Sequence, residues 1–112
     1  MSKVEQLNSI IKHGLAEVII GEVATPNFLI TISRVECSSD LSLAKVFVSV
    51  LPENFSGTAL KRLRASSGSL AKLLKDKTRI IKVPHLSWGI DENLKRAEKI
   101  NKTLEIIKSE ES

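Results

Sequence analysis

The chain has 112 residues, of which 42% are hydrophobic and 27% charged, and a formal net charge of +4 at pH 7. These values are ordinary for a soluble globular protein and indicate a single domain spanning residues 1–112. No apolar run approaches the ~20 residues of a membrane-spanning helix, and residues 1–8 lack a secretory or transit pattern, so we expect a cytoplasmic protein.

The first predicted element is an amphipathic helix over residues 3–22. Ser2 and Glu5 fit a capping box, in which the serine accepts an early backbone N–H. Apolar residues then recur at helical spacing, namely Val4, Leu7, Ile11, Leu15 and Val18. Pro26 ends the pattern, because a proline cannot continue a helix and biases the preceding residue toward extended geometry.

Two alternating runs, residues 28–38 and 43–51, predict a β-hairpin closed by turn-forming residues 38–42. In the first run Leu29 and Thr31 point one way, and Ile30 and Ile32 point the other. Arg34 is a further candidate for the face of Ile30 and Ile32. In the second run one face carries only apolar residues, which are Ala44, Val46, Val48 and Val50.

A basic helical segment follows over residues 58–76, with Ser56 as its expected N-cap. Its apolar stripe comprises Leu60, Leu63, Leu70, Leu73 and Leu74. Ser66, Ser67 and Gly68 interrupt it with three poor helix formers, and either one continuous helix or a kinked pair is consistent with the pattern. We favour a kink, because Ser67 can then cap a new helix whose free N–H groups suit a phosphate.

Residues 79–91 are β-rich and contain Pro84, which predicts an edge strand or one interrupted by a bulge. Asp91 is the expected cap of a last helix, and residues 109–112 are expected to fray. Each helix carries one apolar stripe. The simplest fold is therefore α+β, a three-stranded sheet with helices packed on one face.

Positive charge is concentrated in residues 61–82, which contain eight basic residues and one acidic residue and so carry a net charge of +7. Such a cluster attracts a polyanion and gains free energy by releasing condensed counterions, which favours nucleic-acid binding. Two alternatives to nucleic-acid binding remain. Any single basic residue can simply belong to a solvated helix face, and the whole cluster can bind an acidic protein partner, as in an adaptor protein. Aromatic stacking is expected to be minor, with Phe28, Phe47, Phe55 and Trp88 in core or strand positions.

Catalytic chemistry finds no support in the sequence. One cysteine and two histidines, Cys37, His13 and His85, make a zinc site improbable. Cys37 is expected to be a small, partly buried side chain. Phosphate-binding and dinucleotide-binding glycine loops are missing, so we expect neither enzyme activity, nor a cofactor, nor a small-molecule substrate.

The order strand, helix, break, helix, strand is the core of a KH domain, although the usual Gly-x-x-Gly loop is missing. The chain resembles the ribosome-binding factor A family, a modified relative in which a kink replaces that loop. The resemblance rests on VECSSDLSLAKVFVSVL (35–51), SSGSLAKLL (66–74) and VPHLSWGIDENLKRAEKINKTLEII (83–107). It departs from the family at Ser66, where an alanine is usual, and at Trp88, which replaces another aromatic residue; few basic residues occur near the N-terminus.

This resemblance implies a type II KH-like domain with its kinked helix pair at Ser66–Gly68. It also implies binding to the 30S subunit and its 16S rRNA, support of late subunit maturation including 5′-end processing, and a role in cold adaptation. We expect a monomer without a membrane partner. The candidate RNA-binding residues are Arg62, Arg64, Lys72, Lys75, Arg79 and Lys82, with Ser66, Ser67 and Gly68 setting the bend.

Overall fold

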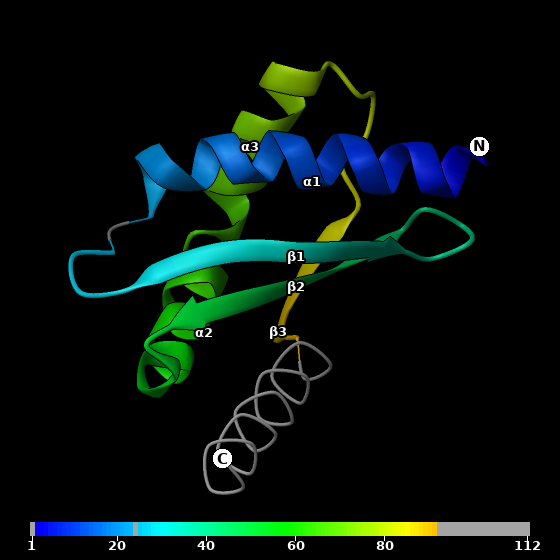
Figure 1. Ribbon diagram of the computed structural model, residues 1–112. Helices are drawn as coiled ribbons and strands as arrows, with labels where there is room; N and C mark the ends of the chain where they lie inside the picture. The colour runs from blue at the N-terminus through cyan, green and yellow to red at the C-terminus, as the bar shows by residue number, and fades with distance from the viewer. Residues whose placement is uncertain (1, 24, 92–112) are drawn as a thin grey trace, which may run out of the picture.

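The computed structural model describes residues 2–23 and 25–91, which form a three-stranded sheet with helices on one face (Figure 1). In chain order the elements are α1 (Lys3–Glu22), β1 (Leu29–Cys37), β2 (Leu43–Leu51), the 3-10 turn η1 (Glu53–Phe55), α2 (Ser56–Ala65), α3 (Ser67–Thr78) and β3 (His85–Ile90). This is the KH-like α+β arrangement that the sequence predicts. The helix expected after Asp91, including the fraying end at 109–112, lies outside the described residues.

Helix α1 begins and ends where the sequence predicts. The N–H of Glu5 donates to Ser2 Oγ at 3.1 Å, which satisfies one of the free donors at the helix start. Its buried side faces the core with Ile11, Leu15 and Ile19, and Gly14 lies on the same side. The predicted amphipathic stripe is therefore the surface by which α1 covers the sheet and contacts α3.

Strands β1 and β2 form the predicted antiparallel hairpin, with a β-bulge between Ile32 and Arg34. Ile32 pairs with Val48 on the buried face, whereas Arg34 pairs with Phe47 on the opposite face. The expectation that Arg34 shares the face of Ile32 is therefore wrong. The extra residue at the bulge shifts the alternation by one position, and Val35 takes the buried place instead.

Strand β3 runs parallel to β2 at the edge of the sheet, in the order β1-β2-β3. The helical crossover through α2 and α3 makes this parallel pairing possible. The predicted edge strand is confirmed, but its expected start at residue 79 is wrong. Helix α3 extends to Thr78, and the strand begins only after the buried Pro84, which has no N–H to donate to the ladder.

Helix α2 starts differently from the prediction. The expected cap, Ser56, is already helical (φ −55°, ψ −45°), and its side chain makes no capping hydrogen bond. The chain turns one step earlier, because η1 follows Pro52 and leads directly into α2. Phe55 thus occupies the cap position, where its ring stacks on Phe28 with 5.2 Å between the ring centroids.

One hydrophobic core lies between the sheet and the helices. From the sheet it takes the four predicted residues of β2 together with Ile32, Val35, Leu86 and Trp88. From the predicted stripe of α2 and α3, Leu63, Leu70 and Leu74 are fully buried and Leu60 is partly buried. Leu73 belongs to the same predicted stripe but is 38% exposed, because it lies about 100° around α3 from the buried Leu74, at the edge of the apolar side.

Candidate nucleic-acid interface

The bend between α2 and α3 falls where the sequence predicts it. Helix α2 ends at Ala65, Ser66 adopts φ −93° and ψ 1°, and α3 starts at Ser67. The N–H of Ser66 donates to the carbonyl of Arg62 at 3.0 Å, and the N–H of Leu70 donates to the carbonyl of Ser66 at 2.8 Å. Two helices therefore meet at one residue, which confirms the kinked pair and excludes a continuous helix.

The predicted role of Ser67 as the cap of α3 is wrong, because Ser66 occupies the cap position and Ser67 is already helical. The hydroxyl of Ser67 instead accepts a hydrogen bond from Nε1–H of Trp88 at 3.3 Å. This partly buried contact joins the first turn of α3 to β3. Trp88 is only 6% exposed, so its indole N–H needs such a partner within the protein.

Three of the predicted RNA-binding residues form one row along α3, and we call Lys72, Lys75 and Arg79 the α3 cation stripe. Their spacing of three and then four residues places them above one another on the same helical surface. All three are exposed, and Arg79 ends the helix in the left-handed conformation (φ 58°, ψ 22°). None of them forms an ion pair within residues 2–23 and 25–91, so their charge faces solvent.

Gly68 continues the stripe one turn toward the bend, four residues before Lys72. A Cβ atom built at this glycine would meet no heavy atom within 4 Å, so the surface above it is open. The first N–H groups of a helix have no partner inside the helix and carry a partial positive charge. The open position at Gly68 therefore extends the positive surface of the stripe to the start of α3.

The other predicted contacts are placed less uniformly. Lys82 is exposed in the segment after α3, and Arg64 is exposed at the end of α2, where it borders a hollow of about 180 Å³ together with Ser67 and His85. Arg62 is only partly exposed, since its guanidinium lies over the ring of Phe28, 5.3 Å from the centroid. The structure thus gives Arg62 a packing role that residue counting along the sequence did not indicate.

Helix α3 is anchored to α1 on the side away from the stripe. Lys77 forms an ion pair with Glu17 of α1, which separates it from the other cations of the basic cluster. Nearby, α1 presents Gly14 to Leu74, which is fully buried, and to Thr78. This anchoring orients α3 so that its apolar side faces the core and its basic side faces outward.

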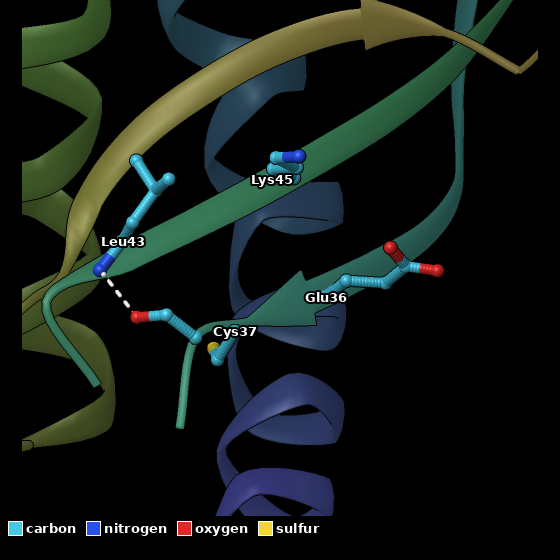
Figure 2. A pocket seen from close by; sticks show the side chains of 5 residues that line it. Glu36, Cys37, Leu43 and Lys45 are labelled. Carbon is cyan, nitrogen blue, oxygen red and sulfur yellow. Dashed lines mark hydrogen bonds between the residues drawn. The ribbon is translucent and has the colours of Figure 1, made fainter. Parts of the chain in front are cut away.

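The histidines and the cysteine lie apart from the α3 cation stripe in the sequence. His13 and His85 are exposed, and Cys37 is partly buried, as expected. Burial raises the pKa of the Cys37 thiol. Figure 2 shows it beside Glu36, Leu43 and Lys45. Together with Ser38 these residues line a hollow of about 330 Å³. Among residues 2–23 and 25–91 no three His, Cys, Asp or Glu side chains are grouped to hold a metal ion.

Across the described ranges, no helix is both long enough and apolar enough to cross a membrane.

The turn of the hairpin is held by side-chain hydrogen bonds: Asp40 accepts from the hydroxyls of Ser38 and Ser42 at 2.7 and 2.8 Å. These hydrogen bonds lower the pKa of Asp40 to about 2. The carboxylate is therefore part of the turn, which places Asp40 outside the basic surface.

Comparison with known proteins gives consistent matches. The family model described as ribosome-binding factor A matches residues 3–104. Ribosome-binding factor A from Halothermothrix orenii is 30% identical over 111 residues, covering 97% of this chain and 91% of the relative. The crystal structure of ribosome-binding factor A from Thermus thermophilus aligns with a TM-score of 0.70 at 27% identity, covering 80% of this chain and 97% of that one.

A second structural match carries information about a complex. It is a homology model of the Thermus thermophilus factor fitted into a cryo-EM map of a 30S complex, with a TM-score of 0.68 at 27% identity. The match covers 79% of this chain and 93% of that one. The fold described above is thus shared with proteins of this group over nearly their whole length.

Proposed function

Because the chain belongs to the ribosome-binding factor A family, we propose that it binds the small ribosomal subunit and its 16S rRNA as a non-enzymatic assembly factor. The observation that carries the proposal is the α3 cation stripe, which is exposed and free of ion pairs within the described residues. The related Thermus factor, whose fold is similar, has been fitted into a map of a 30S complex, which supports the choice of partner.

The stripe suits an RNA backbone for a physical reason. Its residues rise along α3 by about 4.5 Å and then about 6 Å, at 1.5 Å per residue, so the charges form a short row. A row of cations beside a phosphate chain releases condensed counterions, and this term supplies most of the sequence-independent affinity. Arg64 and Lys82, which are exposed before and after α3 in the chain, add positive charge, and the first N–H groups of α3 near Gly68 offer further donors.

The protein then acts by holding a conformation of the maturing rRNA. Recognition rests on phosphates and shape rather than on cutting or modifying the RNA. By this proposal it supports late maturation of the subunit in the cytoplasm, including processing of the 5′ end of 16S rRNA, and contributes to growth in the cold.

The test is a binding assay on purified small subunits over a range of salt concentrations. In one variant each residue of the α3 cation stripe is replaced by glutamine. In the matched control Lys3, Lys12 and Lys45, which lie on α1 and β2, are replaced in the same way. We expect the stripe variant to bind more weakly at low salt. Its slope of log K against log salt, which is negative, should become less steep by about 2, at about 0.7 per phosphate contact on a single strand.

The control variant loses the same net charge, so its slope should stay close to that of the unaltered protein. A folded stripe variant that binds with unchanged affinity and slope would rule out this surface. Digesting the rRNA with RNase distinguishes RNA binding from the remaining alternative, in which the basic face binds an acidic protein. Binding that disappears supports RNA recognition, whereas binding that persists means that the basic face contacts a protein, as an adaptor would.

A further inference from the structure

Ile81 is an isoleucine without cover at the end of the basic surface. It lies in the segment between α3 and β3 and is 94% exposed, more than any other large apolar side chain of the described residues. A single exposed apolar residue is common and needs no explanation by itself. Its neighbours make this one unusual, because Arg79 and Lys82 stand within two residues of it and both are exposed cations.

The segment that carries Ile81 is anchored at both ends. On one side the N–H of Arg79 donates to the carbonyl of Lys75 at 2.9 Å and closes α3. On the other side Pro84 is fully buried, and the N–H of His85 donates to the carbonyl of Ser42 at 2.9 Å. An apolar side chain is therefore presented at a defined place beside two charges, which favours its use in binding.

We propose that Ile81 packs against an unpaired base of the RNA that the flanking cations bind, an inference that rests on the proposed function. An isoleucine gains free energy only by removing apolar surface from water. Phosphates, riboses and the edges of paired bases are polar, and the shallow minor groove of an RNA duplex displays hydroxyl groups. The face of a base is the large apolar surface that RNA offers, and it is accessible where the strand is unpaired.

A protein partner is the competing occupant, and the charges argue against it. The cations beside Ile81 form no ion pair within residues 2–23 and 25–91, and a polyanion satisfies both at once. With Ile81 on a base and the cations on the adjoining phosphates, this end of the interface selects single-stranded segments. The α3 cation stripe alone would bind paired and unpaired RNA without distinction.

The experiment compares three variants on intact small subunits and on protein-free 16S rRNA. Ile81→Ser should weaken binding to both by about threefold to tenfold, because one apolar contact is lost. The salt slope should not change, since the number of phosphate contacts is the same. Ile81→Phe should restore or strengthen binding, because an aromatic ring stacks on a base more strongly than an aliphatic side chain does.

Ile20→Ser is the matched control. Ile20 is 84% exposed on α1, where the last helical turn contains no basic residue, so this change should leave both affinities unaltered. Both residues are exposed, and neither serine variant should alter the folded structure.

Each result decides the inference. Binding by Ile81→Ser equal to that of the unaltered protein overturns it, and so does a loss confined to intact subunits, which would mean contact with a ribosomal protein. If these results occur while the glutamine variant of the α3 cation stripe still loses binding, the proposed function survives alone. If the unaltered protein binds neither subunits nor rRNA, the proposed function fails, and this inference fails with it.

Discussion

The contact between α1 and α3 depends on the absence of a side chain at Gly14. A Cβ atom at this position would lie 2.4 Å from Cδ1 of Leu74 and 3.0 Å from Cγ2 of Thr78. Leu74 is fully buried, so it has little room to rotate away, and the substitution Gly14→Ala should force the two helices apart. Because α3 carries the cation stripe, this is also the contact that fixes the orientation of the candidate interface.

Two opposing terms set the magnitude. Overpacking a core position by one methyl group costs about 1–3 kcal/mol, whereas alanine in place of glycine in a helix interior gains up to about 1 kcal/mol. We therefore expect Gly14→Ala to lower the free energy of unfolding by about 1 kcal/mol. Gly21 is the internal control, because it lies in the same helix and its Cβ position has no neighbour within 4 Å. Gly21→Ala should gain up to about 1 kcal/mol.

The assay is urea unfolding of both variants, followed by circular dichroism and by the emission of Trp88, the single tryptophan of the chain. The informative quantity is the difference between the two free energies, about 1–3 kcal/mol, because the propensity gain largely cancels between them. Equal stability of the two alanine variants would refute the argument that Gly14 is required by close packing of α3.

Three further outcomes test local features of the structure. Ser67→Ala removes the acceptor of the Trp88 indole N–H and should cost about 1 kcal/mol in urea unfolding, because a buried donor loses its partner; an unchanged midpoint would contradict this contact. The pKa of Asp40 is about 2 in the folded protein and lies below its ordinary value of 3.8. Its contribution to stability is therefore present above about pH 4 and lost as the pH falls toward 2. The stability difference between the unaltered protein and Asp40→Asn should accordingly shrink over that range, and a constant difference would argue against the turn hydrogen bonds. Burial raises the pKa of Cys37, so iodoacetamide should alkylate it more slowly at pH 8 in the folded than in the urea-unfolded protein, and equal rates would show that the thiol is open to solvent.

Much of the fold follows from patterns that extend over a few neighbouring residues. Helical spacing in residues 3–22 and alternation in residues 43–51 each repeat several times, so their elements are recognised from the chain alone. The errors occur at positions where one residue changes the geometry. The bulge before Arg34 is defined only by the pairing of β1 with β2, whereas the early turn after Pro52 and the late start of β3 after Pro84 are shifts of an element boundary by a few residues at a proline.

The features of the candidate site also fall into two groups, those that the sequence indicated and those that depend on tertiary contacts. The concentration of charge and the helix-breaking residues 66–68 were visible in the sequence, and so was the spacing that places the α3 cation stripe on one surface. No local signal indicated that Ser67 meets Trp88, 21 positions away, or that Arg62 lies over Phe28. Ile81 was also missed, because its hydrophobicity assigned it to a strand and only the observed exposure shows that it has no cover.

By itself, the order of residues determined the element types, the place of the bend and the sign of the exposed surface, since these depend on backbone preference and on charge carried within one segment. The tertiary structure alone decided which cations stay free and which are engaged. Lys77 and Lys75 are both lysines of the same helix, yet only Lys77 meets a carboxylate of the described residues, Glu17 of α1. The reason is that an ion pair needs two side chains within a few ångströms, and for residues far apart in the chain that proximity arises only when helices pack.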